Sequence, residues 1–320
     1  MHRIQYHQYG GPDTMRLEEF ELPAPQAGEV AVSIRAASVN PIDWKLRQGQ
    51  LKVMTGRAFP RAMGSDFAGV VSAVGPGVTQ FQPGDHVYGM TRLKESGAYA
   101  EAVITLESYL ALKPAGLTFE QAALLPTGAV MAWNGLVERA HLRKGQRVFV
   151  NGATGGVGEA VVQVARMVGA TVAGSTGTAS VVRARELGVE PVYDYTGLGA
   201  AELAQLQAGA FDVVFDTSGT LPVRTAMRML RKSGVFLDIN ATPAKFLHAA
   251  VNRRRHKIFF CTPTTQILTE AADAAVAGDL GMRAGETVLL GAAIGLIADL
   301  EKGRKIPGKG LILVDPAAGD

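Results

Sequence analysis

The sequence predicts an α/β protein in which a doubly wound parallel sheet is joined to a second, mostly β domain. The first observation is a glycine-rich turn at residues 151–158, between an apolar β-like run and a run with helical apolar spacing. The second is a regular alternation of strand-like and helix-like segments after this turn. The third is the lack of long helical patterns before residue 116. A length of 320 residues suits two such domains.

The composition is that of a globular chain without a strong charge bias. Hydrophobic residues make up 47%, and 32 basic against 29 acidic residues leave a formal net charge of +3. This balance favours neither nucleic acid nor a membrane as a partner, although residues 253–257 are locally basic. The single cysteine, Cys261, excludes an internal disulfide and a multi-cysteine zinc lobe. The N-terminus lacks the pattern of a secretory signal, so a cytoplasmic location is expected.

The first part of the chain, up to about Gly116, consists of short β-like runs between Gly, Pro and Asp. A compact β barrel with loops explains this pattern better than a parallel sheet. Near Thr118 the pattern becomes helical, and Thr118 and Gln121 have the spacing of a capping box. A second helix is predicted over 128–138.

After the glycine-rich turn, predicted strands and helices alternate. The strands fall at 171–174, 191–193, 212–215, 234–237 and 258–261, and the helices at 179–187, 200–207 and 223–231. Right-handed βαβ units of this kind form a parallel sheet with helices on both faces. The tail from Thr264 adds two helical patterns and a final strand at 308–314. By spacing alone, this tail could extend either domain.

The glycine-rich turn has the context of a dinucleotide site. A strand enters it and a helix leaves it, so that glycines let the backbone approach a pyrophosphate at the helix N-terminus. The six-residue fingerprint is Ala153-Thr154-Gly155-Gly156-Val157-Gly158, with alanine in place of the first glycine. Because such a turn can also serve only strand-to-helix packing, the motif alone leaves both interpretations open.

Five ordered motifs make the interpretation more specific. They are the segments 36–49, 64–71 with 74–75 and 84–87, 97–101, 152–158, and 308–309. Together they resemble the medium-chain dehydrogenase/reductase superfamily, and within it the zinc-independent quinone oxidoreductase (zeta-crystallin-like) branch. The resemblance runs nearly end to end. It implies a GroES-like catalytic domain from residues 1–124 with 263–320, a Rossmann NADP-binding domain over 125–262, and a homodimer.

The resemblance also implies an active site without a metal. Zinc-dependent relatives carry ligands where this sequence has Asn40 and the pair Ser65-Asp66. Without a Lewis acid, the charge that hydride transfer pushes onto a substrate oxygen must be stabilised by hydrogen-bond donors. Asn40 and Lys45, which the resemblance places at the active-site mouth, are the catalytic candidates. Alternatively, Asn40 caps the turn before Pro41, and Lys45 pairs with Asp43.

The cofactor residues are predicted from the ends of the strands. Where a carboxylate would bind the ribose of NADH, the sequence has hydroxyls, which favours NADPH. A guanidinium and further hydroxyls follow, although the guanidinium could also only solvate a helix face. One family feature departs: Met131 stands where relatives often carry a threonine, and Thr127 could replace it. The resemblance adds Tyr195, because the family often places a tyrosine by the adenine or its phosphate. The predicted cofactor residues are Thr127, Thr154, Gly155, Gly156, Val157, Ser175, Thr176, Ser180, Arg183, Tyr195, Thr217, Ile239 and Asn240.

The sequence therefore predicts an NADPH-dependent, metal-free reductase that transfers hydride to a quinone or an α,β-unsaturated carbonyl. Two alternatives remain open. An enoyl-thioester reductase shares the hydride chemistry and differs only in its acceptor. A cofactor-bound, zeta-crystallin-like protein would instead work by binding RNA, with the basic residues 253–257 as its contact.

Overall fold

The structure is a computed structural model that describes residues 1–199, 202–203, 205, 207–240 and 242–314. The chain divides into two compact units, Met1–Thr127 with Pro263–Asp320, and Gly128–Thr262. The boundary lies inside helix α4 (Pro126–Ala132), close to the predicted one after residue 124. The predicted helix over 200–207 lies partly outside the described residues. None of the helices among the described residues combines the length and the apolar character that a bilayer span requires.

The first unit is built on antiparallel strands. A seven-stranded sheet has the order β15-β16-β3-β5-β6-β8, with β7 paired to β3, and a smaller sheet has the order β2-β1-β4. The tail belongs to this unit because β16 pairs with β3, with Leu311 opposite Ser38. The strands are β1 (His2–Tyr6), β2 (Arg16–Glu19), β3 (Glu29–Ser38), β4 (Arg61–Ala62), β5 (Asp66–Val74), β6 (His86–Met90), β7 (Ala102–Leu106), β8 (Leu110–Leu112), β15 (Ala284–Leu289) and β16 (Lys309–Leu313).

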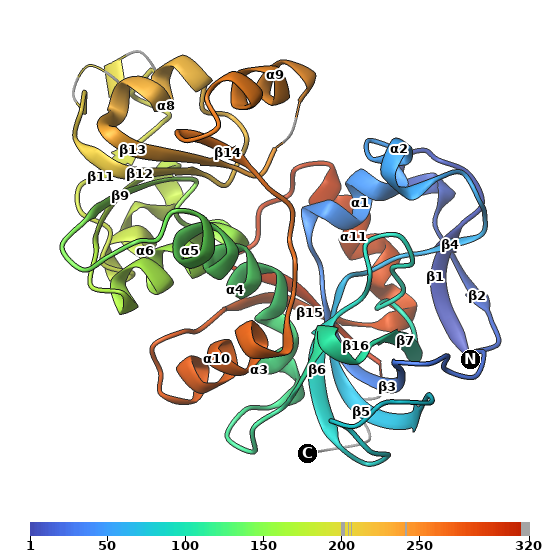
Figure 1. Cartoon of the computed structure of the whole chain (residues 1–320). Coiled ribbons are helices and arrows are strands. Elements are labelled where there is room, and N and C mark those ends of the chain that lie inside the picture. The colour runs from blue at the N-terminus through green and yellow to red at the C-terminus, as the bar shows by residue number, and fades with distance from the viewer. Residues whose placement is uncertain (200–201, 204, 206, 241, 315–320) are drawn as a thin grey trace. The chain divides into compact units, whose positions relative to one another are not determined.

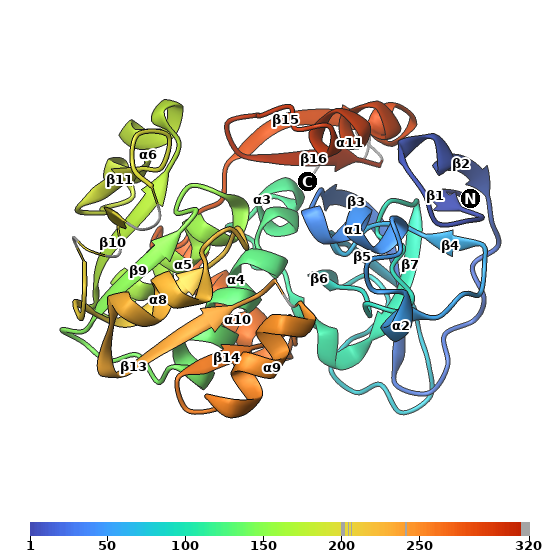
Figure 2. The same cartoon turned by 90° about the horizontal axis from the view of Figure 1, so that it is seen from above.

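Short helices surround these strands. Helix α11 lies along β15 and β16 (Figure 2). The buried guanidinium of Arg47 pairs with Glu301 and so ties α11 to α1. The capping box of Thr118 and Gln121 is confirmed at the start of α3. The helices are α1 (Pro41–Arg47), α2 (Lys52–Thr55), α3 (Phe119–Leu124), α10 (Thr265–Val276) and α11 (Ala293–Glu301), with 3-10 turns at Pro12–Thr14, Glu107–Tyr109 and Leu290–Ala292.

The second unit contains the predicted parallel sheet. Its strand order is β11-β10-β9-β12-β13-β14, which is the 3-2-1-4-5-6 order of a Rossmann fold. Every pairing in this sheet is parallel. Helices α5 and α6 cover one face, and α8 and α9 the other (Figure 1). The strands are β9 (Arg147–Asn151), β10 (Thr171–Thr176), β11 (Val192–Asp194), β12 (Phe211–Asp216), β13 (Leu230–Asp238) and β14 (His256–Ile258).

The helices of the second unit follow the predicted alternation, with shifted ends. They are α5 (Gly156–Met167), α6 (Val181–Glu186) after a 3-10 turn at Thr178–Ser180, α8 (Val223–Met229) and α9 (Pro243–Val251). The predicted helix over 128–138 is α4 followed by a π-helical stretch, Trp133–Arg139. The last predicted strand lies earlier, at His256–Ile258, because its first residue pairs with Phe236 of β13.

Candidate active site

The glycine-rich turn connects β9 to α5, and its backbone requires glycine at two positions. Gly152 has a φ of +83°, which favours glycine. A Cβ added to Gly158 would lie 2.0 Å from the carbonyl oxygen of Gly152, so this position also requires glycine. Helix α5 starts at Gly156, and the first N–H groups of a helix have no partner within it. The turn therefore offers a site for an anion such as a pyrophosphate.

The strand order reverses between β9 and β12, and polar side chains at these two strand ends anchor the turn. The Thr217 hydroxyl donates to the carbonyl oxygen of Asn151 over 2.7 Å. The Asn151 amide nitrogen donates to Asp216 over 2.8 Å, and its amide oxygen accepts from Ser175 over 2.6 Å. In Rossmann folds, a dinucleotide crosses the sheet at this switch point. The predicted residue Thr217 therefore lies beside the glycine-rich turn.

At the end of β10, the predicted hydroxyls are buried. Ser175 and Thr176 are 1% and 2% exposed, and the Thr176 hydroxyl bonds to that of Thr154 over 2.5 Å. The sequence reasoning missed Asp194, which lies opposite Thr176 on β11. Hydrogen bonds from the Thr178 and Thr196 hydroxyls hold the pKa of Asp194 below its usual range. Its place at the end of a predicted strand was the available signal.

The other residues predicted for the adenosine phosphate lie around α6. The Arg183 guanidinium donates to both carboxylate oxygens of Glu159, over 2.9 and 3.1 Å. The hydrogen bond from Arg183 to Glu159 raises the pKa of the guanidinium further. Ser180 is the N-cap residue of α6, and Tyr195 is 52% exposed with its hydroxyl near Gly177. Arg183 must therefore leave or share Glu159 in order to bind a phosphate.

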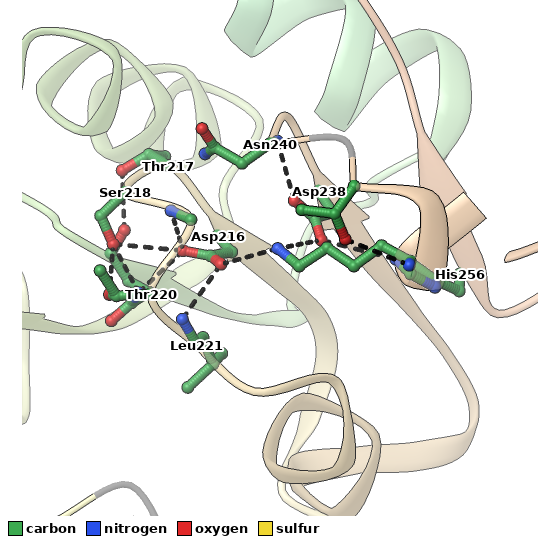
Figure 3. Close-up of polar contacts among 12 residues, drawn as sticks. Asp216, Thr217, Ser218, Thr220, Leu221, Asp238, Asn240 and His256 are labelled. Atoms are coloured by element: carbon green, nitrogen blue, oxygen red, sulfur yellow. Dashed lines mark hydrogen bonds and ion pairs between the residues drawn. The ribbon is translucent and has the colours of Figure 1, made fainter. Parts of the chain in front are cut away.

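Beyond β13, the chain turns at Ile239 and Asn240. The backbone N–H of Asn240 donates to Asp238 over 2.9 Å. The Asn240 side chain packs on Gly219, where an added Cβ would lie 2.5 Å from its Cγ atom. Figure 3 shows Asn240 and Thr217 at the ends of the neighbouring strands β13 and β12. The residues predicted for the nicotinamide end in the second unit thus lie together.

In the first unit, the buried carboxylate of Asp66 accepts hydrogen bonds from several polar side chains, among them Asn40, which also stands where zinc-dependent relatives carry a ligand. We call Asp66, Lys309, Asn40, Thr127 and Ser38 the Asp66 cluster. Asp66 accepts from the Asn40 side chain (3.0 Å), the Thr127 hydroxyl (2.6 Å), the Thr127 N–H (3.1 Å), the Ser38 hydroxyl (3.3 Å) and the Lys309 ammonium (3.1 Å). Lys309 also donates to the carbonyl oxygen of Leu124 over 3.1 Å.

The Asp66 cluster determines which groups of Asn40 and Thr127 remain for a ligand. The Asn40 amide nitrogen donates to Asp66 and, over 3.3 Å, to the carbonyl oxygen of Ser38, so both of its N–H groups are in use. The Thr127 hydroxyl gives its one proton to Asp66 and can only accept further bonds. The catalytic role of Asn40 stays a prediction. To donate to a substrate, the Asn40 amide would have to give up its hydrogen bond to Asp66 or to Ser38.

Helix α1 carries the other candidate and a buried acid. Asp43 accepts from the backbone N–H of Asn40 and from the hydroxyls of Ser65 and Tyr99. Burial raises the pKa of Asp43 to about 6. Lys45 lies on α1, and burial lowers the pKa of its ammonium. A lowered pKa makes an ammonium a better proton donor, which is the property that general acid catalysis by a lysine uses.

The residues that stand where zinc-dependent relatives carry ligands do not fit zinc. Asn40 and Ser65 provide an amide and a hydroxyl, whereas zinc sites use Cys, His and carboxylates. The Asp66 carboxylate already accepts from an ammonium and several neutral donors. No group of three or more His, Cys, Asp or Glu that could hold a metal ion occurs in the described part of the chain.

The basic residues 253–257 do not form a continuous free surface. His256 is 1% exposed. The Arg255 guanidinium donates to the carbonyl oxygen of Arg231 over 2.9 Å, and the Lys257 ammonium donates to that of Arg139 over 2.5 Å. Only Arg253 and Arg254 of this run are exposed. These contacts weaken the RNA-binding alternative.

Comparison with known proteins identifies the family. Two family models match, "Alcohol dehydrogenase GroES-like domain" over residues 26–134 and "Zinc-binding dehydrogenase" over residues 156–253. A quinone-oxidoreductase homolog from the chloroplast of Spinacia oleracea is 31% identical over 77% of this chain and 77% of its own. A 2-methylene-furan-3-one reductase from Solanum lycopersicum is 35% identical over 75% of this chain and 63% of its own.

Among solved structures, the quinone oxidoreductase from Coxiella burnetii is similar throughout. It has a TM-score of 0.88 and 25% identity, and the match covers 98% of this chain and 99% of that one. The chain is thus an oxidoreductase that belongs to the medium-chain dehydrogenase/reductase superfamily. Within this superfamily, its relatives include quinone oxidoreductase homologues, and its first unit is the predicted GroES-like domain.

Proposed function

We propose that this protein is an NADPH-dependent, metal-free reductase that transfers hydride to a quinone or an α,β-unsaturated carbonyl. The observation that carries the proposal is the glycine-rich turn at the switch point of the six-stranded sheet, where Gly158 cannot accept a side chain. The turn suits a pyrophosphate, and the polar ends of β12 and β13 suit a nicotinamide. A cytoplasmic location and a homodimer belong to the same proposal.

NADPH would supply the hydride, and this chain's residues would bind and orient it. The backbone of Thr154, Gly155, Gly156 and Val157 would hold the pyrophosphate. Ser180 and Tyr195, with exposed or half-buried side chains, suit the adenosine phosphate better than the buried hydroxyls of β10. Arg183 would contribute only on leaving Glu159.

The proton and charge chemistry would fall to the first unit. Hydride addition leaves negative charge on the acceptor's oxygen, which a nearby donor must stabilise. We favour Lys45 for this role, because its lowered pKa makes its proton easier to give. Asn40 is the second candidate, but its N–H groups already bond to Asp66 and Ser38. Thr127 can only accept, so it would bind an N–H or O–H of a ligand.

An assay of cofactor oxidation tests the proposal. The purified protein should oxidise NADPH faster than NADH, followed at 340 nm, with at least one acceptor from a panel of quinones, enones and enoyl thioesters. The class of acceptor that reacts would separate the quinone and enone reading from an enoyl-thioester reductase. A protein that binds neither NADPH nor NADH in a thermal-shift measurement would contradict the proposal. A larger shift with NADH would contradict only the predicted cofactor choice.

A further inference from the structure

The second unit buries a group of charges that the proposed chemistry does not use. Asp216 and Asp238 end the neighbouring strands β12 and β13, and both side chains are 0% exposed. The ammonium of Lys245 on α9 lies within 3.9 Å of both carboxylates. His256 of β14 lies beside Asp238 (Figure 3). We call these four residues the Lys245 cluster. Buried charges are costly unless they are paired, so the position of Lys245 needs an explanation.

The distances show that one lysine serves two carboxylates. The Lys245 ammonium lies 2.8 Å from Asp238 and 3.9 Å from Asp216. His256 Nε2 lies 3.7 Å from the same oxygen of Asp238. None of these three contacts has hydrogen-bond geometry, and among the described residues Asp238 Oδ2, Lys245 Nζ and His256 Nε2 are buried without a hydrogen-bond partner. Charge attraction therefore holds the cluster together.

The carboxylates differ in how firmly they keep their charge. Burial raises the pKa of Asp216. Burial acts in the same direction on Asp238, but contacts with His256 and Lys245 hold the pKa of this carboxyl below its usual range. His256 in turn lies 3.0 Å from His248, nitrogen to nitrogen, and stacks on Phe236. Lys245 therefore pairs mainly with a charged Asp238.

Both carboxylates also accept backbone hydrogen bonds from the two turns at this sheet edge. Asp216 accepts from the backbone N–H groups of Gly219 (2.9 Å) and Leu221 (3.2 Å). Asp238 accepts from the backbone N–H of Asn240 (2.9 Å). The Asn240 side chain packs on Gly219, so the two turns touch. By attracting both carboxylates, Lys245 draws together the turn after β12 and the turn after β13.

We propose that Lys245 is a positioning residue that holds these two turns in register for the nicotinamide half of the cofactor. The inference rests on the proposed function, because it assumes that a nicotinamide dinucleotide binds at this edge. Lys245 does not touch the cofactor in this account. It acts through Asp216 and Asp238 on the backbone around Gly219 and Asn240.

Two probes separate positioning from general damage to the fold. NADPH spans both halves of the predicted site, whereas 2′,5′-ADP carries only the adenosine half. In calorimetric titrations of the full chain, Lys245→Met should weaken NADPH binding about tenfold and leave 2′,5′-ADP binding within about twofold. Lys232→Met, an exposed lysine of β13, is the matched control and should change neither.

Two further variants keep the test decisive. Lys245→Arg retains the cation and should restore NADPH binding to within about threefold of the wild type. If Lys245→Met does not fold, the double variant Asp238→Asn with Lys245→Met removes one charge of each sign and keeps an acceptor for Asn240. It should fold and still bind NADPH about tenfold more weakly.

Two results would overturn the inference while leaving the proposed function intact. They are unchanged NADPH binding by Lys245→Met, and an equal loss for NADPH and 2′,5′-ADP, which would indicate damage to the whole unit. A wild-type protein that binds neither probe would instead overturn the proposed function, and the role of Lys245 with it.

Discussion

Each unit of the molecule buries a lysine against a carboxylate, and the two clusters are satisfied to different degrees. In the Asp66 cluster, one carboxylate accepts from a lysine, two side-chain hydroxyls, an amide and a backbone N–H. In the Lys245 cluster, two carboxylates share one lysine, and three polar atoms find no hydrogen-bond partner in the part of the chain that the structure describes. Buried polar groups usually have partners, so the second cluster is the exception.

The difference suggests that the Asp66 cluster stabilises the fold, whereas the Lys245 cluster tolerates changes in its contacts. The Asp66 carboxylate accepts a hydrogen bond from the backbone N–H of Thr127 at the first turn of α4. The Lys309 ammonium is held in place by two hydrogen bonds, because it donates to Asp66 and to the carbonyl oxygen of Leu124 at the end of α3. Removing any member leaves a buried charge or donor unpaired. In the Lys245 cluster, burial raises the pKa of Asp216, so this carboxyl takes up a proton more readily than the carboxyl of Asp238. We therefore expect mutations in the first cluster to affect stability, and those in the second to affect cofactor binding.

The largest expected effect is the loss of the Lys309 ammonium. Lys309→Met should lower the free energy of unfolding by about 3–5 kcal/mol, because it leaves the Asp66 carboxylate charged and buried without a cation. Urea denaturation measures this, with Lys305→Met, an exposed lysine of the same unit, as the control. Lys245→Met should cost less, because Asp238 keeps its contact with His256 and the hydrogen bond from the backbone N–H of Asn240. An equal or larger loss of unfolding free energy in Lys245→Met than in Lys309→Met would contradict this difference between the two clusters.

The next effect is a pH dependence from Asp43. Its folded pKa of about 6 lies above the usual 3.8, so the folded state binds this proton more tightly than the unfolded state. Stability from this group is therefore full below about pH 4, falls as pH rises to about 6, and stays low above that.

Comparison with Asp43→Asn isolates this contribution. The difference in free energy of unfolding between variant and wild type should move in favour of asparagine by up to about 3 kcal/mol between pH 4 and 6. Asp13→Asn, at an exposed acid, should show no such trend. A flat difference for Asp43→Asn would mean that Asp43 ionises as an ordinary exposed acid.

A smaller effect is expected at Thr127, a predicted cofactor residue that belongs to the Asp66 cluster. Thr127→Val removes the hydroxyl that donates to Asp66 and should cost about 1 kcal/mol of stability. It should also raise KM severalfold for a ligand that donates to this oxygen, measured against an analogue without that donor. Thr127→Ser keeps the hydroxyl and should behave as wild type. Equal KM changes for both ligands would show that the Thr127 hydroxyl does not contact the ligand.

The smallest effect is expected at Arg183. Its guanidinium already bonds to Glu159, so Arg183→Gln should change the Kd for NADPH by less than about threefold. Arg185→Gln, on the same helix and exposed, is the control. A tenfold loss in Arg183→Gln alone would show that this arginine leaves Glu159 for the cofactor's phosphate.

Much of the fold could be predicted from local sequence. The strand, glycine turn and helix around Gly155 are visible because alternation and helical spacing are local signals. The capping box of Thr118 and Gln121 is equally local. Asp216 and Asp238 directly follow predicted strands, so their meeting at one sheet edge could have been inferred from the parallel order.

The partners of these side chains could not be predicted in the same way. Lys309 is 243 positions from Asp66 in the sequence, and only the pairing of β16 with β3 brings them together. The interaction of Arg183 with Glu159 depends on how α5 and α6 pack on one face of the sheet. The sequence shows which side chain follows each predicted strand. It does not show which hydrogen bonds that side chain already makes in the folded protein.

The most direct test of the proposed function follows the hydride itself. The wild-type protein is given NADPH carrying deuterium at C4 and an enone from the acceptor panel, and the product is analysed by mass spectrometry and NMR. We expect one deuterium at the former β-carbon of the enone, transferred from only one of the two C4 positions. Oxidation of NADPH without deuterium in any product of the enone, or no oxidation with any acceptor, would contradict it.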